Sequence, residues 1–192
     1  MPSLSLQQWS TARATALDEI EGAHQSIGGA GPGRRYATQQ VNQAYAVLLA
    51  SQFQGFCRDL HSECVDHLAR AVASPALRGI IEDDLRLHRR LDAGNPNPGN
   101  LGADFNRLGL KFWAEVEAAD ARNGQRRQLL EWLTTWRNAI AHQDFDPARL
   151  GGRTTLQLQE VRAWRSACDG LTRSFDAVLR HHLRTVTGAY PW

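Results

Sequence analysis

Apolar residues recur at helical spacing along almost the whole chain, and glycine- and proline-rich stretches separate the helical segments. No stretch alternates apolar and polar residues long enough to predict a β-strand. The predicted helices span about residues 4–27, 36–73, 75–91, 104–122, 125–142 and 157–186. The pattern therefore predicts an all-α fold, a helical bundle of about six helices.

Capping and helix-breaking residues set the predicted boundaries. The run Gly28–Gly33 breaks the chain after the first helix, and Pro75 fits the first turn of the third. Asp104 is predicted to cap the fourth helix, which we expect to end at Asn123-Gly124. We expect one compact domain overall, with residues 1–35 forming an N-terminal helix and glycine-rich loop, and residues 36–192 the main helical domain.

Composition excludes several classes of protein. Of the 192 residues, 42% are hydrophobic and 22% charged, which is typical of a globular chain rather than a disordered one. No apolar run is long enough to span a membrane, and no basic segment followed by an apolar one begins the chain, so we expect a cytoplasmic protein without a membrane partner. Three cysteines are too few, and odd in number, for a disulfide framework.

The charge balance alone does not indicate nucleic-acid binding. The formal net charge is only +2. Of the 22 basic residues, Lys111 is the single lysine, and the others are arginines. Arginine suits phosphate recognition, but a GC-rich genome would produce the same bias.

The segment Trp136–Phe145 carries the strongest candidate chemistry. Arg137 is followed at once by Asn138 and, five residues after the arginine, by His142, at the end of a predicted helix. At 100° per residue, one side of this helix carries an apolar stripe of Leu129, Leu133, Trp136 and Ile140. Nearly opposite lies a polar stripe of Glu131, Thr135, Asn138 and His142. The polar stripe is either an ordinary solvated face or a functional one, with Arg137 at its edge.

Two segments carry a resemblance to a known family. RNAIAH at residues 137–142 matches an Arg-x4-His motif with a polar residue after the arginine, and residues 46–60 look like a first core helix. In these segments and in the final helix the chain resembles the HEPN superfamily of all-α RNases and RNA-binding domains, in particular its RiboL-PSP-HEPN branch, over residues 39–186. The resemblance implies a four-helix core and a homodimer in which two motifs share one cleft.

The resemblance also implies a role and a setting. It suggests a toxin or defence nuclease with an antitoxin or nucleotidyltransferase as partner. Two positions depart from the family pattern: Gln54 stands where relatives often have an acid, and Asp144 stands where toxins paired with nucleotidyltransferases have tyrosine. Control by adenylylation of that tyrosine is therefore not expected.

The implied activity is metal-independent RNA cleavage. Histidine can move protons near neutral pH, and a guanidinium can hold a phosphate and offset charge in the transition state. We expect His142 to transfer protons, Arg137 to bind the scissile phosphate, and Asn138 to orient them. No metal or cofactor is required, because the substrate's 2′-hydroxyl is the nucleophile. The expected substrate-binding residues are Glu131, Thr135 and Trp132.

Other interpretations remain open at this point. The chain could be an RNA- or nucleotide-binding module that does not cleave, or a helical interaction protein. Trp132 could stack on a base or pack against the protein. Cys57, His61 and Cys64 share one helix face and could offer zinc ligands, although small core residues explain the same spacing.

Overall fold

The computed structural model describes residues 1–27 and 35–192, and this part of the chain is helical with no β-strand. The predicted glycine-rich break at residues 28–33 lies outside the described residues. The elements are α1 (Leu4–Gln8), a π-helical turn (Trp9–Arg13), α2 (Ala14–Ile27), α3 (Arg35–Ala71), α4 (Pro75–Arg86), α5 (Arg90–Ala93), α6 (Pro98–Asn106), α7 (Phe112–Ala119), α8 (Asn123–His142) and α9 (Leu158–Thr187). The predicted all-α fold is confirmed. Within this part of the chain, no helix is long and apolar enough to cross a membrane.

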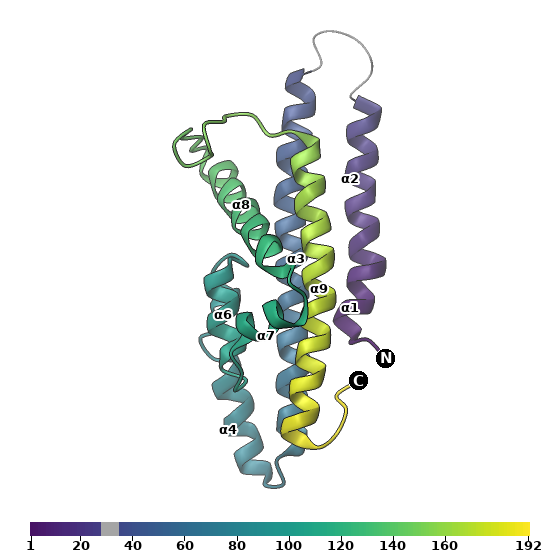
Figure 1. Cartoon of the computed structure of the whole chain (residues 1–192), viewed down its shortest axis with the longest axis vertical. Coiled ribbons are helices and arrows are strands. Elements are labelled where there is room, and N and C mark those ends of the chain that lie inside the picture. The colour runs from purple at the N-terminus through teal and green to yellow at the C-terminus, as the bar shows by residue number, and fades with distance from the viewer. Residues whose placement is uncertain (28–34) are drawn as a thin grey trace.

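Two long helices, α3 and α9, form the spine of the molecule and lie side by side along their length (Figure 1). The N-terminal helix α2 lies on one side of this pair, and α4 to α8 lie on the other. Helix α8 contacts both α3 and α9, but its C-terminal end diverges from them toward the edge of the molecule. The last turns of α8 are therefore placed at the surface.

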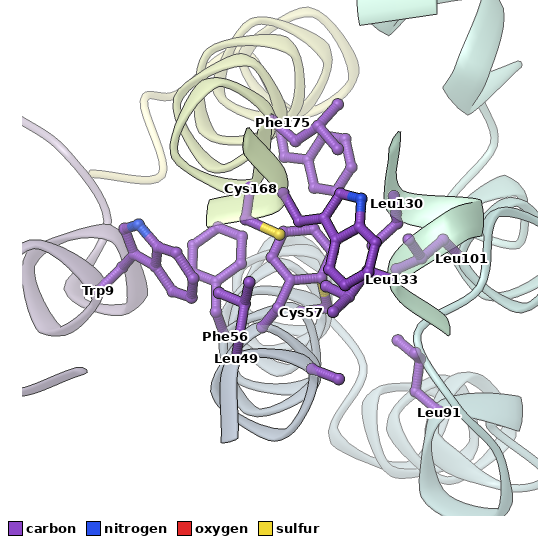
Figure 2. Close-up of a cluster of buried hydrophobic side chains, with 14 of the residues drawn as sticks. Trp9, Leu49, Phe56, Cys57, Leu91, Leu101, Leu130, Leu133, Cys168 and Phe175 are labelled. Atoms are coloured by element: carbon purple, nitrogen blue, oxygen red, sulfur yellow. The ribbon is translucent and has the colours of Figure 1, made fainter. Parts of the chain in front are cut away.

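A single aromatic-rich core joins these layers (Figure 2). Trp9 from the N-terminal segment packs edge-on against Phe53 and Phe56 of α3, with ring centroids 5.9 Å apart in each pair. The indole of Trp9 donates a hydrogen bond to Asp169 of α9 at 2.9 Å. The N-terminal helix is thus part of the same core as the rest of the described chain.

The middle of the chain differs from the sequence expectation. Asp104 does not cap a helix of its own: it is buried inside α6, and its carboxylate accepts hydrogen bonds from the backbone N–H groups of Arg90 and Leu91, both at 2.9 Å. It therefore caps α5. The sequence pattern predicts α4 and α5 as one continuous helix. Between them the backbone turns sharply at His88, which has a φ of 60°.

The expected end of the fourth helix is also wrong. That helix is divided into α6 and α7 by a turn at Gly109, where φ is 90°. Asn123 then begins α8 instead of ending the preceding helix, and its side chain donates to the carbonyl of Val116 at 2.7 Å. An Asn-Gly pair breaks helices well, but here the buried amide of Asn123 joins two helix ends, which a local rule does not detect.

The cluster of Cys57, His61 and Cys64 belongs to the core. All three residues are fully buried, and the imidazole of His61 packs edge-on against Phe105. This confirms the interpretation of the spacing as core packing. Burial, reinforced by the charge of Arg89, lowers the pKa of His61 from 6.5 to about 4.

The lowered pKa of His61 predicts a pH-dependent stability. The unfolded chain binds a proton at this histidine more readily than the folded chain does. The free energy of unfolding is therefore highest above pH 6.5 and decreases as the pH falls toward 4. We expect a loss of roughly 2–3 kcal/mol in the free energy of unfolding across this window. Urea denaturation of the wild type and of His61→Leu at several pH values measures it. If the free energy of unfolding decreases no more in the wild type than in His61→Leu over this window, the lowered pKa of His61 is contradicted.

Candidate functional site

Helix α8 places the Arg-x4-His segment in its last two turns. Leu130, Leu133, Trp136 and Ala139 are buried and fix one side of the helix against the core. The helix ends at Gln143, which adopts the left-handed conformation with a φ of 53°, and the N–H of Asp144 donates to the carbonyl of Ala139 at 2.9 Å. The buried side of the segment and this capping hydrogen bond fix its position, and His142 lies at the end of the helix.

The polar stripe of α8 is not uniform in the structure. Glu131 and His142 are exposed, whereas Thr135 and Asn138 are partly buried. The interpretation of the stripe as an ordinary solvated face therefore fails at Asn138, whose side chain bonds Asn95 in the loop between α5 and α6. Trp132 is 38% exposed and lies beside Gly151, where an added Cβ would stand 3.3 Å from its ring.

Arg137 is a half-buried cation without an acidic partner. Its Nη1 lies 3.3 Å from Oδ1 of Asn138 and 3.5 Å from Oδ1 of Asn95, and both contacts are to neutral amide oxygens. Over the described ranges, no carboxylate lies within salt-bridge distance of it. By contrast, Arg126 on the same helix pairs with Asp120 at 2.8 Å. A partly desolvated guanidinium with unused charge favours an external anion.

The amide of Asn138 is oriented by its neighbours. Its Oδ1 accepts a hydrogen bond from Nδ2 of Asn95 at 2.7 Å as well as the longer one from Arg137. Because a carbonyl oxygen has two lone pairs, this oxygen is fully used, and only the NH₂ group of Asn138 remains for a further partner. It can donate to a phosphate oxygen or to a neutral ring nitrogen of His142.

His142 borders a small hollow of about 80 Å³ beside the end of α8. The hollow is lined by Thr135, Asn138, Ala139, His142, Asp144, Arg149 and Leu150. This volume equals a few water molecules, so it is too small for a nucleotide. Arg149 pairs with Asp144 across the rim at 2.9 Å and brings a second guanidinium near His142.

The structure brings some of the predicted site residues together and separates others. His142, Asn138 and Thr135 share the hollow, whereas Arg137, Glu131 and Trp132 do not line it. Asn95 and Arg149 were missed in the sequence. Asn95 stands in a Gly-Asn-Pro-Asn-Pro-Gly segment that the sequence identifies only as a helix stop, and no sequence signal marks Arg149.

The fold and the site define a class: an all-α protein that presents a histidine and an unneutralised arginine at the end of one surface helix. Comparisons of the chain with protein-family models, with curated proteins and with solved structures found no match.

Proposed function

We propose that this protein is a metal-independent endoribonuclease that cleaves RNA by attack of the 2′-hydroxyl on the adjacent phosphate. The observation that carries the proposal is the half-buried guanidinium of Arg137, which has no acid beside it in the described chain and lies on the last turns of the helix that ends at His142. Among the described residues its hydrogen bonds are to amide oxygens alone, so its charge is available to a phosphate.

The proposed reaction needs two proton transfers and one site for negative charge. The 2′-oxygen forms a bond to phosphorus as its proton passes to a neutral imidazole, and the P–O5′ bond breaks as the leaving oxygen takes up a proton. The products are a 2′,3′-cyclic phosphate and a 5′-hydroxyl. Arg137 offsets the charge that develops on the phosphate, and the NH₂ group of Asn138 donates to a phosphate oxygen.

A second copy of the chain would complete this site. Beside His142 a single chain offers a hollow of only about 80 Å³, and an exposed helix end holds a reactive phosphate poorly. A two-fold partner presenting the same face of α8 would supply a cleft, another Arg137 and another His142. One histidine would then act as base while the other acts as acid.

The proposed setting follows from the HEPN resemblance. We place the enzyme in the cytoplasm, acting on RNA as a toxin or defence nuclease, with an antitoxin or nucleotidyltransferase as its partner. Asp144 occupies the position of the adenylylated tyrosine, so such a partner would act by binding.

The test is cleavage of a single-stranded RNA with its products identified. We expect cleavage to persist in EDTA, fragments to end in a 2′,3′-cyclic phosphate, and a DNA oligonucleotide of the same sequence to remain intact because it lacks the nucleophile. Mass spectrometry of the fragments measures the end groups. Loss of cleavage in EDTA that zinc or magnesium restores would overturn the metal-free mechanism.

A second candidate function is RNA binding without cleavage. It is favoured by the separation of the two groups, since Arg137 does not line the hollow that His142 borders. In that case RNA would bind with an affinity that falls as salt rises, and no cyclic phosphate would form.

A further inference from the structure

The loop between α5 and α6 contacts the candidate site through one side chain. Asn95 contributes both ends of its amide: Nδ2 donates to Asn138 at 2.7 Å, and Oδ1 lies 3.5 Å from Nη1 of Arg137. Asn138 in turn accepts from Arg137 at 3.3 Å. These three side chains form a closed triangle of polar contacts in which the guanidinium is the only charged member.

The loop that carries Asn95 is itself firmly anchored. Gln54 of α3 donates to the carbonyls of Leu91 and Gly94, at 2.6 and 2.8 Å. On the other side, Nδ2 of Asn100 donates to the carbonyl of Asn95 at 2.9 Å. The backbone is therefore held on both sides of the residue that reaches α8, and through Gln54 it is tied to the long central helix.

This anchoring matters because Arg137 has no ion pair to fix it. A free arginine side chain has many rotamers, and ordering it costs conformational entropy. A preorganised guanidinium binds a phosphate without that cost, and it already faces the charge that develops in the transition state. Asn95 does not need to touch the substrate to have this effect.

We propose that Asn95 is a positioning residue, which orients the amide of Asn138 and through it the guanidinium of Arg137 for binding a phosphate. The effect of Asn95 on cleavage rests on the proposed function, whereas its effect on the order of Arg137 does not. Gln54 supports this positioning role by fixing the loop. The chemical class of ligand is a phosphodiester, because the triangle leaves one positive charge that no described acid neutralises.

The first measurement follows Arg137 itself. In ¹⁵N-labelled full-length protein, the Nε–Hε signal of Arg137 is assigned with Arg137→Lys, and its heteronuclear NOE reports the order of the side chain. We expect a high value in the wild type and a clear fall in Asn95→Ala. The matched control is Asn97→Ala, which removes the side-chain acceptor for the N–H of Asn100 in the same loop but has no contact with Arg137. It should leave the signal unchanged.

The second measurement is the affinity for a 2′-O-methyl RNA oligonucleotide, which cannot be cleaved. Asn95→Ala should weaken binding by roughly threefold to tenfold, the effect of losing one ordinary hydrogen bond. In an Arg137→Ala/Asn138→Ala background, which lacks both groups that Asn95 orients toward a phosphate, the same change should have no further effect. Asn95→Asp should keep Arg137 ordered but weaken binding more than Asn95→Ala, because a carboxylate would neutralise the guanidinium.

The outcomes separate the two proposals. An Arg137 signal as ordered in Asn95→Ala as in the wild type would overturn the role of Asn95, and so would a further loss of affinity in the Arg137→Ala/Asn138→Ala background. If the wild type neither binds nor cleaves RNA, the proposed function fails, and the order of Arg137 still decides whether Asn95 positions it. For an active enzyme, Asn95→Ala should lower kcat by a larger factor than it raises KM, whereas Asn97→Ala should change neither.

Discussion

Alanine at position 142 or 137 should abolish RNA cleavage while leaving the fold intact. General acid–base catalysis contributes about 10²–10⁴-fold, and electrostatic stabilisation by a positioned donor about 10²–10³-fold, so each variant should lose at least two orders of magnitude in kcat. His142 is exposed and Arg137 has no ion pair to lose. The free energy of unfolding should therefore change by no more than about 0.5 kcal/mol for His142→Ala.

Two control variants make this result specific. Arg126→Ala removes a guanidinium from the same helix, where it bonds Asp120 at 2.8 Å and Asn123 at 2.7 Å. It should lower the melting temperature and leave cleavage unchanged. His181→Ala removes an exposed histidine from α9 and should change neither property. Full cleavage by His142→Ala would show that another group moves the protons.

The Arg137→Ala and His142→Ala variants should also differ in which property they lose, RNA affinity or catalysis. Without the guanidinium, affinity for uncleavable RNA should fall together with kcat, because Arg137 contacts phosphate in both ground and transition states. Without the imidazole, affinity should be almost unchanged, since proton transfer occurs only during the reaction. Binding and single-turnover kinetics on the two variants measure this split, and equal loss of affinity in both would contradict the separate roles.

The long helices were accessible to sequence analysis because their signals are local. The expected spans 36–73 and 157–186 lie close to the observed Arg35–Ala71 and Leu158–Thr187. In both, steps of three and four between apolar residues persist over many turns, and glycine or proline follows. The same argument located α8 and placed Leu133 and Trp136 in the core.

Asp104 shows where local rules fail. An acid just before an apolar run has the pattern of an N-cap, yet its carboxylate is buried and caps α5, 13 and 14 residues earlier in the chain. The pattern of one segment does not identify which other helix end lies beside it. For the same reason, the predicted third helix joined α4 with α5 and the predicted fourth joined α6 with α7, which the structure separates.

For a related reason, the sequence predicted the site residues on α8 but not Asn95, which reaches them from another segment. A helical wheel describes the helix that carries Asn138 but not the loop that reaches it from 43 residues away. A solvated polar stripe therefore describes Glu131 and His142, which are exposed, but not Thr135 and Asn138, which are partly buried. The lack of an acid beside Arg137 is likewise a property of the folded chain. In the sequence, acidic residues stand on both sides of it, at Glu131 and Asp144.

Dilution should reduce cleavage per chain if two copies of α8 share the site. The face available for pairing includes the exposed Ala141 and His142 in the last turn of α8. The C-terminal end of α8 lies at the edge of the molecule (Figure 1). Sedimentation of the wild type should show a dimer at concentrations that cleave RNA, and specific activity should fall below the dissociation constant. Ala141→Arg should weaken the dimer and activity together. Leu77→Arg, at an exposed apolar position on α4, should affect neither.

Mixed dimers give the sharpest form of this expectation. If one histidine acts as base and its two-fold mate as acid, a dimer of one wild-type and one His142→Ala chain has lost one of the two roles. Such dimers should lose well over half of the activity, and an equal mixture after exchange should retain about a quarter, the share of wild-type pairs. Two sites that work independently would retain about half. Cleavage at full rate by a chain that sediments as a monomer would refute the shared site, because each histidine would then have to serve both roles alone.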